Sequence, residues 1–487
     1  MWSGRNALIL LLIIAVGVAV RVVSLRHEAL DGDEAFSYNV AVLPLHDALV
    51  KISNDLVHPP FHYLVLKAGV DLWGASALGI RIWSLLFGIA TLILVVSIGG
   101  KLPGARYTGL LAAALLALNE THIFFSQQAR SYAMYAFLVL LLVEWVARIS
   151  REQRSPRLWV AGAALMIVLV YTHYVAAIYV LAAAIAVFAS KLPARTKLLT
   201  FGIGALAALS FLPWLAIEAK VYKAKQGFGK HLEWQGHPHF YELKDIWASA
   251  LGVMNFKGAT TLVFLLAILL ALAALKYIPK QSLLVSPAVV TLFSLAFIPP
   301  IVVFLLSVPP LDLPLFGLRH HLPSIVALVI LCSYGLEVLA LRFGENRARV
   351  FAIGSILLLG IAGVTCANGL AHLPARYPYD RIAHDVQANF AKGPEAFTTW
   401  PYGIGAPVNL YCGTRCVEPL PADESRLPST FVLLYRPRAE QEMPYYKRLI
   451  RDGYSPISTP VYYTDGRHGI WGTSIVVMQR PGSVVAK

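Results

Sequence analysis

The sequence predicts an α-helical polytopic membrane protein that carries a small soluble α/β domain at its C-terminal end. Of its 487 residues, 57% are hydrophobic and only 14% are charged, and the mean hydropathy is +0.63. Apolar runs of about 20 residues, the length that crosses the hydrocarbon of a bilayer, recur as far as residue 369. Beyond that point charged residues and prolines become frequent, and no further long apolar run follows.

We predict about eleven membrane spans. The apolar runs lie at residues 5–25, 79–100, 106–121, 129–147, 157–172, 174–190, 198–217, 259–277, 283–307, 319–341 and 349–369. The first is expected to remain as a helix rather than to be removed as a signal peptide, because it is long, contains Arg21 and has no small-residue cleavage pattern after it. Residues 1–369 are therefore predicted to form one transmembrane domain.

The basic residues predict a cytoplasmic N-terminus, because cytoplasmic loops retain Lys and Arg. In that orientation the inside loops carry most of the bases, among them Arg5, Lys101, Arg148 and Arg347, whereas the first outside segment, 26–78, is rich in acids. This topology explains the formal charge of +14 without a nucleic-acid partner. We expect a multi-pass protein of the inner (cytoplasmic) membrane.

Two outer segments have special compositions. Residues 60–74 could pass for a short span, but a crossing there would turn most of the later bases outward, so we interpret them as a juxtamembrane helix in the outer interface. Lys67 and Asp71, spaced i, i+4, would share its wet face. The outer loop 218–258 is rich in Tyr, Trp, His and Lys, and could close over a bound substrate or form an aromatic interface belt.

Residues 370–487 are predicted to form an extracytoplasmic α/β domain. The β-rich runs 430–435 and 473–478 indicate strands, and 380–391 and 440–452 indicate helices. This domain could bind an acceptor or act as a stabilising cap.

The four cysteines divide into two pairs. Cys412 and Cys416 are expected to form a local disulfide, because an extracytoplasmic compartment is oxidising. No second cysteine pair accompanies them, which disfavours a metal site. Cys332 and Cys366 fall inside predicted spans and are expected to be core residues.

Acidic residues just beyond the first span are the first candidate site. Asp31, Asp33 and Glu34 lie close to the predicted membrane edge, where ionisable groups are often functional. Of the adjacent pair, one carboxylate could act as a general base while the other orients a partner or a metal. The alternative is an acidic helix start, because Asp stabilises an N-cap.

Two further motifs are predicted on the same side. His58 precedes two prolines that fix the backbone, and its imidazole could bind a phosphate, a metal or a carboxylate, or simply be solvated. Arg130 lies beside Gln127 and Gln128 and suggests anion binding, because a guanidinium matches phosphate oxygens. An interface anchor paired with Glu120 is the alternative.

The remaining polar candidates complete a ring at the outer rim. Arg81 is expected to snorkel or to pair with an acid of the first loop. His173 lies between two predicted spans, and Arg319, His320 and His321 lie at the mouth of a late one. The sequence has no P-loop, Gly-rich dinucleotide turn, zinc motif or clear internal repeat, and the absent P-loop argues against an ATP-driven pump.

The order of these motifs resembles the GT-C superfamily of polyprenyl-phosphate-dependent glycosyltransferases, in particular the protein O-mannosyltransferase and aminoarabinose-transferase group. Asp33-Glu34 is followed by His58-Pro-Pro, then by Arg-x-x-Ser-x-x-x-Gly at 81–88, Ala-Arg-x-Tyr at 129–132 and Arg-His-His-Leu-Pro at 319–323. The likeness covers about residues 1–340.

The resemblance implies a membrane glycosyltransferase that moves a sugar, with inversion, from a polyprenyl-phosphate donor to a lipid, glycan or protein acceptor on the outer (periplasmic) face. It implies that Asp33 is the general base and Glu34 its partner. Groups that bind the donor phosphate would be Arg130, His58, Arg319, Gln128 and Tyr132, supported by Arg81, His320 and His321.

Some relatives hold a divalent metal ion between a carboxylate and a histidine, and Glu34 with His173 could do so here. The glutamate that precedes Lys-Pro-Pro in the aminoarabinose branch is Val57 in this chain, which argues against the metal site and against an aminoarabinose or lipid A assignment. Two other classes stay open. A lipid or sugar transporter or flippase without transferase activity would place ionisable groups near mid-membrane, and a scaffold protein would not require the clustered Asp, Arg and His.

Overall fold

The computed structural model consists of two compact units. It describes residues 4–23, 25, 29–152, 154–225, 237–252, 259–278, 286–311, 313, 315–371, 378–390, 395–399, 404–421, 423, 426–436, 443–463 and 473–480. Unit 1 comprises Met1–Val23, Leu43–Leu72 and Arg81–Gly369. Unit 2 comprises Ser24–Val42, Trp73–Ile80 and Leu370–Lys487.

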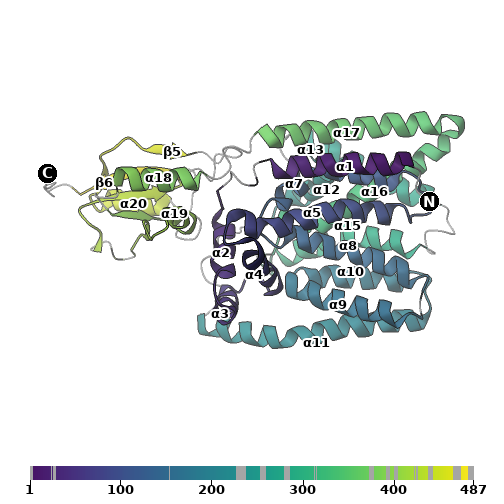
Figure 1. Cartoon of the computed structure of the whole chain (residues 1–487), viewed down its shortest axis with the longest axis horizontal. Coiled ribbons are helices and arrows are strands. Elements are labelled where there is room, and N and C mark those ends of the chain that lie inside the picture. The colour runs from purple at the N-terminus through teal and green to yellow at the C-terminus, as the bar shows by residue number, and fades with distance from the viewer. Residues whose placement is uncertain are drawn as a thin grey trace. The chain divides into compact units, whose positions relative to one another are not determined.

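Unit 1 is a bundle of mostly apolar helices (Figure 1). The helices are α1 (Gly4–Val22), α3 (Leu45–Asp55), α4 (Phe61–Trp73), α5 (Ala77–Gly99), α6 (Thr108–Leu118), α7 (Glu120–Ser126), α8 (Tyr132–Ile149), α9 (Pro156–Thr172), α10 (Ala176–Ala189), α11 (Ala194–Lys225), α12 (Phe240–Ala248), α13 (Thr260–Tyr277), α15 (Pro287–Leu306), α16 (Leu322–Ala340) and α17 (Arg347–Ala371). Short 3-10 segments η2 (Ser249–Leu251), η3 (Leu318–His321) and η4 (Leu341–Asn346) interrupt them. The predicted helical fold is confirmed.

Each predicted span contains a helix, but the number of spans stays a prediction. Among the described residues, seven helices are long and apolar enough to cross a membrane, or eight if the bent pair α6 and α7 is one span. The run Leu318–Ala371, counted as one, contains both α16 and α17, whereas α9 and α10 are shorter apolar helices. On α4, Lys67 and Asp71 form the expected i, i+4 ion pair, with 3.6 Å between Nζ and Oδ1.

A carboxylate from another helix caps the start of α6. The first backbone N–H groups of a helix have no partner within it, and water cannot reach them here because Thr108 is fully buried. Glu337 of α16 accepts hydrogen bonds from the N–H groups of residues 106–108 at 2.7 to 3.1 Å, and from the Thr108 hydroxyl at 2.6 Å. Its negative charge also complements the helix dipole.

An arginine from α1 caps the other end of α6. Arg21 is fully buried and donates hydrogen bonds to the carbonyls of Leu116 and Ala117, both at 3.1 Å. Its Nη2 lies 2.8 Å from His122 Nδ1, and its Nε lies 3.4 Å from Ser126 Oγ. His122 and Ser126 belong to α7, which follows α6 after a bend of 67°. Arg21 thus holds both sides of the bend.

Unit 2 is built on a six-stranded sheet with helices on both faces. The strands are β1 (Ala396–Thr398), β2 (Glu418–Pro419), β3 (Thr430–Tyr435), β4 (Ser455–Pro456), β5 (Val461–Tyr463) and β6 (Thr473–Gln479), in the order β2-β1-β3-β6-β4, with β5 also paired to β6. Strand β1 is parallel to β2 and β3, and β6 is antiparallel to β3, β4 and β5. The helices are α2 (Gly32–Ala41), α18 (Tyr379–Phe390), α19 (Ala406–Cys412) and α20 (Met443–Arg451).

The side chains of β3 alternate between two cores, as the period of a strand requires. Val432 and Leu434 pack with residues of α18 and α19, whereas Phe431, Leu433 and Tyr435 pack with Leu449 of α20. The predicted strands at 430–435 and 473–478 are β3 and β6, and the predicted helices are α18 and α20. The α/β prediction is confirmed.

The cysteines are arranged as predicted. Cys412 and Cys416 form a disulfide at the end of α19. Cys332 and Cys366 are free and buried in α16 and α17.

Residues 24–42 belong to unit 2, whereas the sequence assigned them to the transmembrane domain 1–369. Ala29 is buried in the core that includes α18 and α19, and the Leu30 N–H donates to the Tyr411 hydroxyl at 2.7 Å. Helix α2 packs against α19. The difference arises because contacts with a segment far away in the sequence, rather than proximity to the first span, determine where these residues pack.

We expect Glu337→Ala to destabilise the protein by about 2–4 kcal/mol, because it leaves several buried N–H groups of residues 106–108 without an acceptor. Thermal unfolding of the detergent-solubilised protein measures the effect. The matched control is Glu345→Ala, an exposed acid on η4, which should melt like the native chain. Equal melting temperatures for the two variants would contradict the capping role of Glu337.

Candidate functional site

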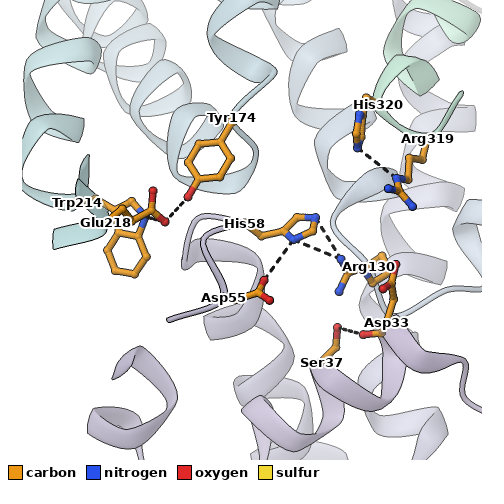
Figure 2. Close-up of polar contacts among 10 residues, drawn as sticks. All are labelled: Asp33, Ser37, Asp55, His58, Arg130, Tyr174, Trp214, Glu218, Arg319 and His320. Carbon is orange, nitrogen blue, oxygen red and sulfur yellow. Dashed lines mark hydrogen bonds and ion pairs between the residues drawn. The ribbon is translucent and has the colours of Figure 1, made fainter. Parts of the chain in front are cut away.

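Arg130 and His58 form a buried pair in unit 1. Arg130 Nη2 lies 3.1 Å from His58 Nε2 and 3.3 Å from His58 Nδ1 (Figure 2). The two residues are 5% and 7% exposed. Because a guanidinium only donates hydrogen bonds, the imidazole nitrogen must accept. His58 Nδ1 also lies 3.9 Å from Asp55 Oδ2 at the end of α3.

The loop between α7 and α8 holds Arg130 in place. The Arg130 N–H donates to the Gln128 carbonyl at 2.8 Å, and the Arg130 carbonyl accepts from the Ser84 hydroxyl of α5 at 3.3 Å. Gln127 Nε2 donates to the Arg21 carbonyl at 3.1 Å. The residue that caps α6 therefore also anchors the loop that carries Arg130.

His173 lies among aromatic rings in the turn between α9 and α10. Its ring stacks on Tyr135, with centroids 4.8 Å apart and planes 15° apart. The centroids of the His320, His58 and Tyr132 rings lie 5.0, 5.9 and 6.2 Å from that of His173. The structure thus brings together predicted residues from four distant parts of unit 1. We define the Arg–His cluster as His58, Arg130, Tyr132, His173, Arg319 and His320.

The η3 segment contributes two of these residues. Arg319 Nε donates to His320 Nε2 at 3.3 Å (Figure 2), and His320 Nδ1 lies 2.5 Å from the Leu315 carbonyl. His320 therefore carries its proton on Nδ1 in this arrangement. His321, which follows, is fully buried, with its Nδ1 3.5 Å from the Tyr179 hydroxyl.

The imidazoles near Arg130 are held neutral. Burial first, and then the charge of Arg130, set the pKa of His58 well below its ordinary value. The same causes lower the pKa of His62 on α4 to about 3. The positive charge of the cluster is therefore carried by its guanidinium groups, with neutral imidazoles as hydrogen-bonding neighbours. Such an environment suits an anion that has exchanged its water for protein donors.

The two predicted catalytic acids, on α2 in unit 2, differ in exposure. Asp31 is the N-cap: its Oδ1 accepts from the Glu34 N–H at 2.7 Å, while the Glu34 carboxylate accepts from the Asp31 N–H at 3.4 Å. Glu34 is fully buried in this capping box, whereas Asp33 is exposed. The Asp33 carbonyl accepts from the Ser37 hydroxyl (Figure 2). Asp33 is thus the accessible acid of the pair.

One expectation needs correction. Arg81 is only 1% exposed, so protein encloses its side chain and it does not snorkel to water. The metal ion expected between Glu34 and His173 stays a prediction. The Glu34 carboxylate belongs to the capping box, and His173 Nδ1 accepts from the Val175 N–H at 3.2 Å. Among the described residues, no group of three or more His, Cys, Asp or Glu could hold one.

Several polar interactions in the helices were not anticipated from the sequence. Glu218 of α11 accepts from the Tyr174 hydroxyl and from Trp214 Nε1 (Figure 2). The capping roles of Arg21 and Glu337 also went unpredicted. The available signal was an ionisable residue within an apolar run, which requires a partner. Residues 226–236 and 253–258 of the predicted outer loop 218–258 lie outside the described residues.

We expect acid to destabilise the protein through its buried neutral histidines. Between its native pKa of about 3 and its unfolded value of about 6.5, His62 binds more protons when the chain is unfolded. The free energy of unfolding therefore rises with pH across this window and falls on acidification. At pH 5.5 the loss due to His62 is about 1 kcal/mol relative to neutral pH.

Melting temperatures of detergent-solubilised protein between pH 5 and 7 test this prediction. His62→Gln should show a shallower pH dependence than the native chain. The control is His46→Gln, at a histidine whose side chain is 88% exposed, and it should keep the native slope. A native slope in His62→Gln as well would contradict the prediction.

Comparison with known proteins supports the same architecture. Residues 57–217 match the family model described as dolichyl-phosphate-mannose-protein mannosyltransferase. This range includes His58, Arg81, Arg130 and His173. No curated protein matched the chain.

Solved structures resemble the chain over nearly its whole length. ArnT from Cupriavidus metallidurans in the apo state has a TM-score of 0.59 at 15% identity, with 98% of each chain covered. The same protein bound to undecaprenyl phosphate has a TM-score of 0.56 at 15% identity and the same coverage. The oligosaccharyltransferase AglB from Archaeoglobus fulgidus, in complex with an inhibitory peptide and a dolichol-phosphate, has a TM-score of 0.55 at 12% identity, covering 100% of this chain and 76% of that one.

These likenesses agree with the motif order noted in the sequence. At such low identities the solved structures show a similar fold, whereas the family model shows a sequence likeness over residues 57–217. The chain has the fold seen in ArnT and AglB.

Proposed function

We propose that the protein is a membrane glycosyltransferase that moves a sugar from a polyprenyl-phosphate donor to a lipid, glycan or protein acceptor. The observation that carries this proposal is the buried Arg130–His58 pair within the Arg–His cluster. It lies in the part of the chain that matches the mannosyltransferase family model. The two similar structures with bound undecaprenyl phosphate and dolichol-phosphate support a lipid-linked donor.

The Arg–His cluster would bind the donor phosphate. Arg130 supplies a charged donor, and the neutral His58 beside it can donate or accept a hydrogen bond. As the bond between the sugar and the phosphate breaks, negative charge grows on the leaving phosphate. Donors that are already positioned stabilise that charge without reorganising. Arg319, Gln128 and Tyr132 are proposed to assist.

An apolar groove between helices of unit 1 fits the lipid part of such a donor. The groove has a volume of about 430 Å³ and is lined almost wholly by apolar atoms. Its walls include Phe61 and Leu64 of α4 and Trp83 of α5. The next residue along each helix belongs to the site: His62 follows Phe61, and Ser84, which bonds to the Arg130 carbonyl, follows Trp83. Grooves lined mainly by hydrophobic and aromatic side chains are typical of ligand sites.

Asp33 is proposed as the general base. Its exposed carboxylate would take the proton of an acceptor hydroxyl while that oxygen forms a bond to the anomeric carbon. The bond from this carbon to the phosphate oxygen would break with its electron pair remaining on the phosphate. Attack opposite the leaving group inverts the anomeric centre. Glu34 would serve by fixing the start of α2.

The orientation of the chain is also part of the proposal. The bases of the predicted inside loops favour a cytoplasmic N-terminus in the inner membrane. The acidic segment and residues 370–487 would then lie on the periplasmic side, where an undecaprenyl- or dolichol-type donor would present its sugar.

We expect Asp33→Asn to lower sugar transfer by about 100-fold or more, because the amide cannot accept the acceptor's proton. Transfer from polyprenyl-phosphate sugars is measured with purified protein and a panel of donors and acceptors. The matched control is Asp31→Asn, because Asn caps a helix as well as Asp does, and it should keep nearly native transfer. Undiminished transfer in Asp33→Asn would exclude Asp33 as the base.

We expect Arg130→Ala to weaken donor binding at least about tenfold, because a charged hydrogen-bond donor to the phosphate is lost. Binding of a polyprenyl phosphate is measured alongside the melting temperature. The control is Arg148→Ala, in the last turn of α8, the helix that follows the loop of Arg130, and it should bind the lipid normally. If Arg130→Ala lost stability as strongly as binding, its role would be structural and the phosphate site would be wrong.

A further inference from the structure

The segment that presents Asp33 is anchored by the C-terminal part of the chain. Leu30, one residue before the N-cap of α2, is 2% exposed, and its N–H donates to the Tyr411 hydroxyl at 2.7 Å. Ala29 is 4% exposed and lies in the core that includes Ile382 of α18 and Val408 of α19. Three residues beyond Leu30, Asp33 stands in the first turn of α2.

Tyr411 is itself held on a firmly fixed helix. The disulfide between Cys412 and Cys416 closes the turn directly after it. Asn409 Oδ1 accepts from the N–H groups of Cys416 and Val417, both at 2.8 Å, and Gln387 Nε2 of α18 donates to the Cys412 carbonyl at 2.8 Å. The hydroxyl that receives the Leu30 N–H is therefore backed by a covalent link and by hydrogen bonds on both sides of the turn.

We infer that Tyr411 is a positioning residue for Asp33, the proposed general base. The C-terminal domain would act in the reaction by fixing the start of α2. This inference rests on the proposed role of Asp33 as the general base. The direction of a side chain in the first turn depends on where the helix begins, and here the beginning is set by the Asp31–Glu34 capping box and by the Leu30 anchor.

Removal of the anchor should loosen this segment and little else. Without the Tyr411 hydroxyl, the buried Leu30 N–H loses the acceptor that this side chain provides. A buried N–H without an acceptor destabilises the folded state, and the segment can recover a hydrogen bond by moving toward water. The packing of the Tyr411 ring against the core of α18 and α19 would remain in Tyr411→Phe. The expected consequence is a less well oriented Asp33 on an otherwise intact domain.

Two measurements on the full-length detergent-solubilised protein test the inference. In Tyr411→Phe, amide hydrogen exchange of peptides covering 29–38 should be at least about tenfold faster, while that of β3 and β6 stays native. Transfer assays should show kcat reduced about tenfold, with KM for the polyprenyl-phosphate donor unchanged. The control is Tyr454→Phe, which removes a hydroxyl bonded to the Pro428 carbonyl in the other core of the same domain, and it should leave both readouts native.

The outcomes are distinct. Native exchange at 29–38 in Tyr411→Phe would overturn the anchoring role, whether or not the protein transfers sugar. Faster exchange throughout unit 2 would also overturn it, since Tyr411 would then be a general stability residue. If exchange is faster only at 29–38 but kcat is unchanged in an active enzyme, Tyr411 does not position the acid. If the native protein transfers no sugar, the proposed function fails while the exchange result still decides the anchor.

Discussion

Both ends of α6 must be satisfied inside the protein, and much of unit 1 depends on how this is done. In an apolar environment water cannot bond to free N–H and C=O groups, so each needs a protein partner. Glu337 supplies acceptors at the start of α6, and Arg21 supplies donors at its end. Each charge also has the sign that the helix dipole favours. Arg21 also contacts α7, and its carbonyl accepts from the Gln127 side chain. The residue that caps the end of α6 therefore also fixes the position of the loop that carries Arg130.

In the Arg–His cluster, buried histidines are neutral and still take part in hydrogen bonds. Neutral His58 and His62 stand beside the Arg130 guanidinium, so the polar groups are dense while the positive charges remain few. In a transporter, ionisable side chains near mid-membrane would line the path of the substrate. Here Arg21 and Glu337 bind the ends of a helix, which accounts for their presence structurally and leaves the cluster as the better candidate for a ligand.

The sequence predicted the features that depend on composition and local pattern. Apolar runs identified the helices, alternation identified β3 and β6, and residue type singled out His58, Arg130 and His173, which the structure brings together. It could not predict what depends on distant contacts. The burial of Arg81, the caps of α6 and the packing of residues 24–42 with unit 2 come from residues far away in the chain. Similarly, Asp33 and Glu34 are adjacent carboxylates that the sequence pattern does not distinguish. Their exposure differs because the capping box buries Glu34 and not Asp33.

The two-sided packing of β3 has a consequence for α2. Strand β3 pairs with β6 from Thr430 opposite Gln479 to Tyr435 opposite Ser474, and its alternate residues face different cores. A shift of its register by one residue would exchange the side chains presented to α18 and α19 with those presented to α20. Since α19 carries Tyr411, the alignment of a short strand near the end of the chain bears on an acid placed more than 390 residues earlier. Insertions or deletions within β3 would therefore alter the packing of α19 in the C-terminal domain and, through Tyr411, the position of Asp33 near the N-terminus.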